Sequence, residues 1–359
     1  MISVLYLLGG LVIVTVGAEL LVKGAARGAA TLGMSPLVVG LTVVAFGTSA
    51  PEVALSLFAS LEGQTDLALG NVVGSNAFNL LFIIGVSALL APLTVARDLV
   101  RYDVPVLIAS SIVIMLMSLD STIGWIDGGL LGAFLLLYVV WTIKRCPSPT
   151  PIAEDSDGQE QHDKSGLWRD GALLIVGLVL LTLGAKLLVM GGVEIAKKLG
   201  LSELVIGLTI LAAGTSVPEI ATSVVAALRG QRDIAVGNAV GSSIFNILFV
   251  LSAAALASPN GVPVNASALY FDMPVMIATS LACFPLFYTG YRIDRWEGAL
   301  LLAYYLAYIS YLILAATEHV ATQGFGQVML YFLLPLTFLV LAVLLYRSWR
   351  RPRARPNES

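Results

Sequence analysis

Twice in this chain a proline and a glutamate stand inside a long apolar run, first in the segment Gly40-Leu-Thr-Val-Val-Ala-Phe-Gly-Thr-Ser-Ala-Pro-Glu52. The pattern returns 167 residues later as Gly207-Leu-Thr-Ile-Leu-Ala-Ala-Gly-Thr-Ser-Val-Pro-Glu219, identical at nine of thirteen positions. A second block, Asp66-Leu-Ala-Leu-Gly-Asn-Val-Val-Gly-Ser-Asn-Ala-Phe-Asn79, returns at the same offset as Asp233-Ile-Ala-Val-Gly-Asn-Ala-Val-Gly-Ser-Ser-Ile-Phe-Asn246, identical at nine of fourteen. The chain therefore contains an internal duplication.

The composition places the chain in a lipid bilayer. Its mean hydropathy is +0.90, with 58% apolar and 12% charged residues, far from the values of a soluble domain. A span must cross about 30 Å of hydrocarbon. Eleven apolar runs are long enough, near residues 2–23, 36–61, 67–92, 102–119, 125–143, 171–190, 203–228, 234–258, 271–289, 296–316 and 328–346. We predict an all-α polytopic membrane protein with about 11 spans.

The basic residues predict the orientation, because cytoplasmic loops are enriched in Lys and Arg. With the N-terminus outside, seventeen of the 20 Lys and Arg residues fall on the cytoplasmic side. The exceptions are Lys186, Lys197 and Lys198. We therefore expect an external N-terminus and a cytoplasmic C-terminus.

One polar stretch rich in proline and charge, residues 146–168, separates two groups of five spans and is typical of a linker. We divide the chain into a first repeat (1–145), a cytoplasmic linker (146–169), a second repeat (170–316), and an additional helix with a basic tail (317–359). Because five is odd, equivalent helices of the two repeats run in opposite directions. Such 5+5 inverted repeats form their binding site near the midplane, where the halves meet.

The duplication extends to the first span of each half, as Gly17-Ala-Glu-Leu-Leu-Val22 and Gly184-Ala-Lys-Leu-Leu-Val189. Glu19 and Lys186 are thus equivalent positions, but inversion places them near opposite membrane faces. We do not expect them to pair. Instead we expect Glu19 to reach the headgroup region, close to Lys23 one turn away.

The first motif combines a loosened helix with a carboxylate. Pro51 has no N–H and crowds the carbonyl of Gly47, so backbone oxygens are released near Thr48, one turn before Glu52. Released carbonyls at membrane depth must be satisfied by protein or by an ion, and an intramembrane carboxylate costs about 2.5 to 3.5 kcal/mol at insertion. The second half repeats this arrangement in Gly214, Thr215, Pro218 and Glu219. The pattern indicates a cation site.

The second block adds polar side chains to one helix face, because its residues recur every four positions. These are Asn71, Ser75 and Asn79 in the first half, and Asn238, Ser242 and Asn246 in the second. Gly70, Gly74, Gly237 and Gly241 have the spacing that lets membrane helices approach closely. Interhelical hydrogen bonding and close packing would by themselves explain these serines, asparagines and glycines, so their role as ligands stays open.

The donor set consists of oxygen atoms. Neither His162 nor His319 lies in a span, and the span residue Cys283 is outside the motifs. Oxygen ligands suit hard cations such as Ca2+ or Na+ and disfavour Zn2+ or Cu+. Two carboxylates balance one Ca2+ or two Na+, and either load relieves the repulsion between them. This equivalence favours exchange of one cation for the other.

Four aspartates stand at expected helix starts. Asp66 and Asp233 head the helices of the second block, and Asp103 and Asp272 each come two residues before a proline. Aspartate at a helix start commonly accepts hydrogen bonds from free N–H groups. We interpret all four as N-caps.

At these motifs the chain resembles the cation/calcium exchanger superfamily, in particular the prokaryotic sodium/calcium exchangers. The GTSxPE and GNxxGSxxxN patterns occur in both halves, and the resemblance covers residues 1–316. It implies Ca2+ between Glu52 and Glu219, with carbonyl ligands at Thr48 and Thr215. It further implies that Na+ uses Ala45, Ser49, Ser75, Ala212, Ser216 and Ser242, with Asn79 and Asn246 completing the central site.

The resemblance implies an electrogenic Na+/Ca2+ antiporter of a prokaryotic inner membrane that expels Ca2+ by alternating access. We expect Ca2+ and Na+ as transported partners, no cofactor, no nucleic acid and a monomer. Some relatives have Asp where this chain has Asn246, so K+ dependence is not expected. Three alternatives stay open: H+/Ca2+ antiport, an intramembrane metal-dependent hydrolase, and a channel.

Overall fold

The computed structural model describes residues 2–63, 65–145, 167–198 and 212–317, together with 322, 326 and 327. Three sequence-based predictions therefore fall wholly or mostly outside the described residues. They concern most of the linker, the first part of the run 203–228, and the final run 328–346 with its basic tail.

Almost every described residue is helical, because apolar backbone at membrane depth must satisfy its own hydrogen bonds. The first half contains α1 (Ile2–Leu32), α2 (Pro36–Val39), α3 (Ala45–Thr48), α4 (Ala50–Leu61), α5 (Thr65–Ala77), α6 (Ile84–Leu90), α7 (Val104–Met117) and α8 (Trp125–Arg145). The second contains α9 (Leu167–Lys198), α11 (Ala212–Gly214), α12 (Val217–Leu228), α13 (Arg232–Phe245), α14 (Leu251–Ala257), α15 (Met273–Tyr288) and α16 (Arg295–Ala316).

Short π-helical or 3-10 turns join several of these helices into continuous spans. The π-helical turns are Gly40–Val44, Phe78–Ile83, Leu99–Asp103, Asn246–Val250 and Ala268–Asp272, and the 3-10 turn is Ser118–Asp120. Among the described residues, 8 helices are long and apolar enough to cross a membrane, and the bent pair Pro36–Thr48 and Ala50–Leu61 brings the number to 9. The all-α polytopic fold is confirmed, and α12 is the described end of a further predicted span.

Two small sheets tie the halves together at opposite ends of the bundle. β1 (Leu93–Thr94) pairs antiparallel with β4 (Arg292–Ile293), and β2 (Thr122–Ile123) pairs antiparallel with β3 (Val262–Pro263). Each sheet joins a loop of the first half to a loop of the second. Inverted repeats allow this pairing, because the loop after the third span of one half lies on the same side as the loop after the fourth span of the other.

The helices of the second block form the centre of the bundle. In the most apolar 18-residue stretch of each span, 78% of Leu67–Leu90 and 83% of Arg232–Ala257 is buried inside the protein. The corresponding shares are 28% for Ile2–Thr31 and 22% for Trp168–Lys198. The polar faces of these central spans are therefore shielded from lipid by the remaining helices, which turn apolar side chains outward.

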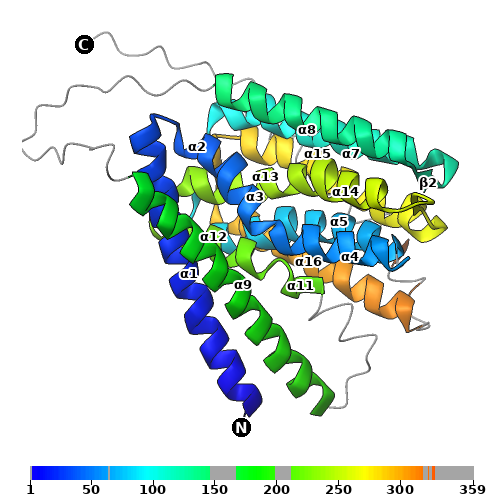
Figure 1. Ribbon diagram of the computed structural model, residues 1–359, viewed down its shortest axis with the longest axis horizontal. Coiled ribbons are helices and arrows are strands. Elements are labelled where there is room, and N and C mark those ends of the chain that lie inside the picture. Colours follow the sequence, from blue (N-terminus) through cyan, green and yellow to red (C-terminus); the bar gives the residue numbers. More distant parts are fainter. Residues whose placement is uncertain are drawn as a thin grey trace, which may run out of the picture.

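α1 and α9 lie side by side and cross the other helices obliquely (Figure 1). Their backbones touch, since a Cβ on Gly17 would lie 2.8 Å from Leu181 N and one on Gly177 would lie 2.7 Å from Leu21 N. Gly10, Gly24, Gly184 and Gly191 make the equivalent close approaches. Small residues at seven-residue intervals thus hold α1 and α9 together as one packed pair.

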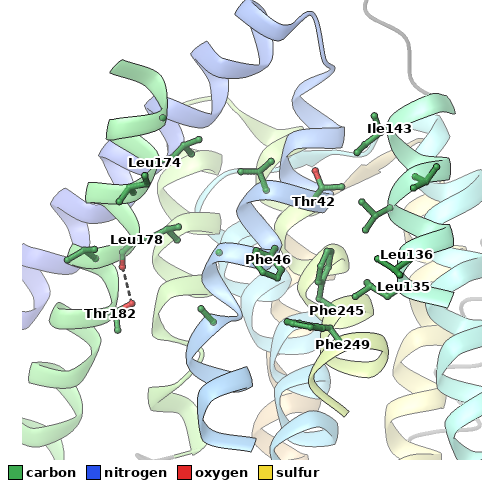
Figure 2. A pocket seen from close by; sticks show the side chains of 18 of the residues that line it. Thr42, Phe46, Leu135, Leu136, Ile143, Leu174, Leu178, Thr182, Phe245 and Phe249 are labelled. Carbon is green, nitrogen blue, oxygen red and sulfur yellow. Dashed lines mark hydrogen bonds between the residues drawn. The ribbon is translucent and has the colours of Figure 1, made fainter. Parts of the chain in front are cut away.

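A groove of about 1030 Å³ runs between α9 and the central helices (Figure 2). Phe46, Phe245 and Phe249 lie at its centre in Figure 2, between Leu178 of α9 and Leu135 of α8. Its lining is apolar apart from the hydroxyls of Thr42 and Thr182, which donate to carbonyls of their own helices. A groove of this composition suits hydrocarbon and does not suit a cation.

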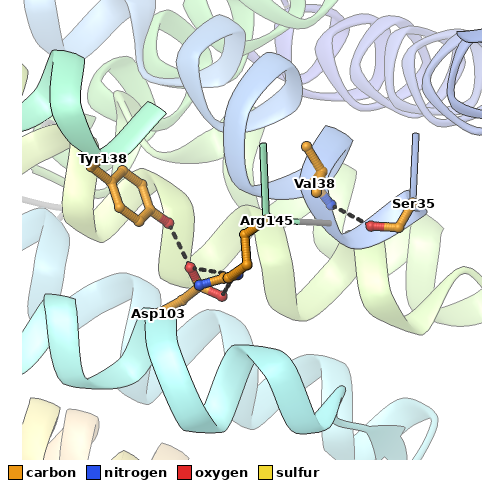
Figure 3. A network of polar contacts seen from close by, with 5 residues as sticks. All are labelled: Ser35, Val38, Asp103, Tyr138 and Arg145. Atoms are coloured by element: carbon orange, nitrogen blue, oxygen red, sulfur yellow. Dashed lines mark hydrogen bonds and ion pairs between the residues drawn. The ribbon is translucent and has the colours of Figure 1, made fainter. Parts of the chain in front are cut away.

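The predicted capping role of three aspartates is wrong. Asp103 and Asp272 occupy the N-cap positions of α7 and α15, but their backbone angles are helical and their side chains accept no capping hydrogen bond. The carboxylate of Asp103 instead accepts hydrogen bonds from Tyr138 at 3.1 Å and from Arg145 at 2.8 Å (Figure 3). Gln231 occupies the N-cap of α13, which excludes Asp233 from that position.

Asp272 makes the repeat-related contact with Tyr308, at 3.1 Å. Both aspartates are therefore hydrogen-bonded by a tyrosine of the next span, 35 or 36 residues later. A π-helical turn precedes each proline, at the place where the sequence predicted the start of a helix. The side chain of Asp66, the fourth aspartate, lies outside the described residues.

Candidate cation-binding site

Both copies of the first motif interrupt a helix. α3 ends at Thr48, Ser49 adopts φ −78° and ψ 4°, and α4 begins at Ala50 with a bend of 43°. In the second half Ser216 adopts φ −90° and ψ 11° between α11 and α12. Each proline lies in the first turn of the following helix, where its missing N–H costs no hydrogen bond. The predicted loosening of the helix is confirmed.

Glu52 and Glu219 lie in the first turns of α4 and α12 and are each 1% exposed. Helix N-termini favour negative charge, so the local backbone partly stabilises each carboxylate. Ser216 Oγ donates to Glu52 Oε1 at 3.0 Å, and Ser49 Oγ donates to Glu219 Oε1 at 3.4 Å. Each carboxylate is therefore bound by the serine of the opposite half, which brings the two motifs into one site.

The second-block helices contact this centre from both sides. Thr48 Oγ1 donates to Asn238 Oδ1 at 3.1 Å and lies 3.4 Å from Ser242 Oγ, so α3 touches α13 of the other half. Ser75, the residue equivalent to Ser242, is instead contacted by Ser216, whose Oγ lies 3.4 Å from Ser75 Oγ. The hydroxyl groups at Thr48, Ser75, Ser216 and Ser242 thus form the junction between the halves.

Asn71 and Asn238 hold the glutamate-bearing helices in place. Asn71 Nδ2 donates to the carbonyl of Glu52 at 3.3 Å and to Ser56 Oγ at 2.9 Å. Asn238 Nδ2 donates to the carbonyl of Glu219 at 3.3 Å and to Ser223 Oγ at 3.0 Å. These asparagine amides clamp α4 to α5 and α12 to α13, and therefore position the carboxylates.

Ser56 and Ser223, the serine partners of these asparagines, were not predicted from the sequence. Both lie one turn after the glutamates and are buried, with 0% and 1% exposure. They also obey the offset of 167 residues. That shared position was the signal that could have identified them.

Several buried polar atoms at the centre have no hydrogen-bond partner within the described part of the chain. They include Glu52 Oε2, Glu219 Oε2 and both amide atoms of Asn79 and Asn246. Buried polar groups in folded proteins are normally paired, and two buried carboxylates without compensation are costly. Unpaired oxygens at equivalent positions of both halves fit a cation ligated mainly by oxygen.

Other predicted residues are placed less completely. Ala45 begins α3, and its carbonyl accepts a hydrogen bond from Ser49 N at 3.0 Å and lies 3.4 Å from Thr48 Oγ1. Ala212 begins α11, but its side chain lies outside the described residues. Thr215 stands between α11 and α12.

The paired glycines were also expected to permit close packing. A Cβ on Gly241 would lie 2.8 Å from Leu41 O, and one on Gly237 would lie 3.2 Å from Leu37 O. Gly70 and Gly74 meet no such neighbour among the described residues. In the part of the chain that the structure describes, no group of three or more His, Cys, Asp or Glu could hold a metal ion.

A family model described as "Sodium/calcium exchanger protein" matches residues 2–144 and 171–314. The chain belongs to this family. The exchanger is 37% identical over 281 residues to the inner membrane protein YrbG of Escherichia coli K12, covering 77% of this chain and 85% of the relative. It is 32% identical over 343 residues to the sodium/calcium exchanger MaX1 of Methanosarcina acetivorans, covering 86% and 97%.

Its structure is similar to that of the sodium-calcium exchanger NCX_Mj soaked with 10 mM Na+ and zero Ca2+, with a TM-score of 0.75 and 32% identity. The match covers 86% of this chain and 98% of the other. The resemblance inferred from the motifs is confirmed. The protein is an integral membrane transporter of a cation/Ca2+ exchanger family, not an enzyme, so the hydrolase alternative is dropped.

Proposed function

We propose that the exchanger is a Na+/Ca2+ antiporter that expels Ca2+ by alternating access. The observation that carries this proposal is the central pair of buried carboxylates. Each is hydrogen-bonded by a serine of the opposite half, and each has one oxygen without a hydrogen-bond partner among the described residues. Two negative charges in one buried site are compensated equally by one Ca2+ or by two Na+. Loading with one cation therefore displaces the other.

In the proposed site Glu52 and Glu219 bind Ca2+ together with the carbonyls of Thr48 and Thr215. The proposed Na+ ligands also include Ala45, Ser49, Ser75, Ala212, Ser216 and Ser242, with Asn79 and Asn246 at the centre. Oxygen ligands of this kind suit both ions. Movement of more Na+ charge than Ca2+ charge in each cycle would make the transport electrogenic.

The proposed division is 1–145, 146–169, 170–316 and 317–359, with the N-terminus outside and the C-terminus in the cytoplasm. The excess of Lys and Arg in the cytoplasmic loops supports this orientation. Similarity to an inner membrane protein of Escherichia coli supports an inner membrane location. Because both halves of the site come from one chain, a monomer suffices.

Proton-coupled Ca2+ transport is the second candidate, since two buried glutamates could each carry a proton instead of Na+. The two candidates differ in the gradient that drives Ca2+ movement. Purified protein in liposomes loaded with Na+ should take up 45Ca2+ on dilution into Na+-free medium. If 45Ca2+ uptake is instead driven by an imposed pH gradient in the absence of Na+, the protein couples Ca2+ transport to protons.

A further inference from the structure

An ion pair joins α1 to the end of α12 at the predicted cytoplasmic side. Glu19 Oε1 lies 2.5 Å from Arg229 Nη2, and Arg229 is the C-cap residue of α12. The two side chains are 47% and 62% exposed and line a cavity of about 500 Å³ together with Lys23, Arg27 and Gln231. The sequence placed Glu19 close to Lys23 but did not identify Arg229 as its partner.

The internal duplication assigns this ion pair a counterpart at the opposite face. At the offset of 167 residues, Glu19 corresponds to Lys186 on α9, and Arg229 corresponds to Glu62. Glu62 is the C-cap residue of α4, as Arg229 is of α12. At each of the two positions the charge has the opposite sign in the other half. Lys186 and Glu62 therefore again carry opposite charges, as an ion pair requires.

Only one of the two ion pairs is formed within the described residues. Lys186 and Glu62 have no ion pair there, whereas Glu19 and Arg229 are in contact. The helices show the same asymmetry, because α1 packs along α12 while α9 does not pack comparably along α4. The structure is therefore closed between α1 and α12 at the predicted cytoplasmic side.

The close crossing of α1 and α9 links the two faces mechanically. A Cβ at Gly17 or Gly177 would meet backbone atoms of the partner helix, so the pair has little freedom to slide internally. If the pair moves outward against the central helices, Glu19 leaves Arg229. The same movement carries Lys186 toward Glu62 at the external end of α4.

We propose that Glu19–Arg229 and Lys186–Glu62 are alternating ion pairs, the first holding the cytoplasmic side closed and the second holding the external side closed. This inference rests on the proposed alternating-access function. It assigns Lys186 and Glu62 a shared role that neither residue displays in the present arrangement.

Disulfide trapping tests the second ion pair directly. In a chain with Cys146→Ser and Cys283→Ala, Glu62→Cys with Lys186→Cys is compared with Glu19→Cys with Arg229→Cys, and each single-cysteine variant is a control. We expect the 19/229 pair to cross-link at rest and the 62/186 pair to cross-link when Na+ and Ca2+ drive turnover. Absence of the 62/186 cross-link in protein that transports 45Ca2+ would overturn the proposal.

A second measurement does not depend on cross-linking. Spin labels at Ile2→Cys and Leu119→Cys report the position of the α1/α9 pair relative to the external loop. Arg229→Gln should shift the ratio of the two distance populations about two- to fivefold toward the externally closed arrangement, as expected for an exposed ion pair, and Lys186→Gln should shift it the other way. Arg27→Gln, a cation in the same cavity, is the matched control.

Equal shifts for Arg229→Gln and Arg27→Gln would contradict the ion-pair role. Failure of the proposed function gives a different result, because the 19/229 cross-link at rest and the distance shifts of the variants need no turnover and would persist in protein that moves no Ca2+ under a Na+ gradient.

Discussion

At the scale of single residues, the site combines ligands with residues that position them. Asn71 and Asn238 share a helix face with Ser75 and Ser242, and the sequence alone does not separate their roles. The structure distinguishes their roles, because the amide groups of Asn71 and Asn238 donate hydrogen bonds to the backbone carbonyls of Glu52 and Glu219. Asn79 and Asn246 keep their amide atoms unpaired within the described residues.

Asn71→Ala should weaken Ca2+ binding, because it frees the α4 segment that carries Glu52. Loss of the two hydrogen bonds to Glu52 O and Ser56 should cost about 1 to 3 kcal/mol of binding free energy or stability. Asn76→Ala is the matched control, since Asn76 Nδ2 donates to Val72 O of its own helix. Calorimetric Ca2+ titration of both variants gives the comparison, and equal losses would argue against the positioning role.

The buried Asp103–Arg145 ion pair allows a prediction about stability. Its side chains are 0% and 11% exposed, so Arg145→Leu should destabilise the protein by about 3 to 5 kcal/mol by leaving a buried carboxylate without its cation. Asp103→Asn combined with Arg145→Leu should recover much of that loss. Thermal unfolding in detergent measures both, and a double variant no more stable than Arg145→Leu would refute the explanation.

At the scale of helices, the sequence predicted the break at Pro51 and its repeat at Pro218, because proline has a fixed local effect. It did not predict the π-helical turns at Phe78–Ile83 and Asn246–Val250. These turns begin at or next to the central asparagines Asn79 and Asn246, and no single residue type encodes their i to i+5 hydrogen bonds. The same limit explains the wrong N-cap interpretation of Asp103 and Asp272.

The crossing of α1 and α9 is sensitive to one added methyl group. Gly17→Ala would place a Cβ 2.8 Å from Leu181 N, so the helices must separate, and we expect a lower unfolding temperature and slower Ca2+ flux. Gly9→Ala meets nothing within 4 Å and should be neutral or slightly stabilising. Transport and thermal unfolding of the two variants decide the matter, and similar behaviour would contradict a tight crossing.

At the scale of the whole molecule, the duplication fixed most of the architecture in advance. Two halves of five spans imply opposite orientation, and the pairs β1–β4 and β2–β3 join the loops that this orientation places together. Sequence could not predict which of two related arrangements the molecule adopts. That choice depends on how the α1/α9 pair packs against α12 or α4, and the inverted repeats make both contacts available.

The central claim is that Glu52 and Glu219 form one site rather than two. Equilibrium 45Ca2+ binding to purified protein, with and without Na+, tests it with the variants Glu52→Gln and Glu219→Gln. We predict one competitively displaced Ca2+ per chain, lost in either variant, because each carboxylate supplies half of the compensating charge. Two Ca2+ per chain, with each variant removing one, would contradict a shared site.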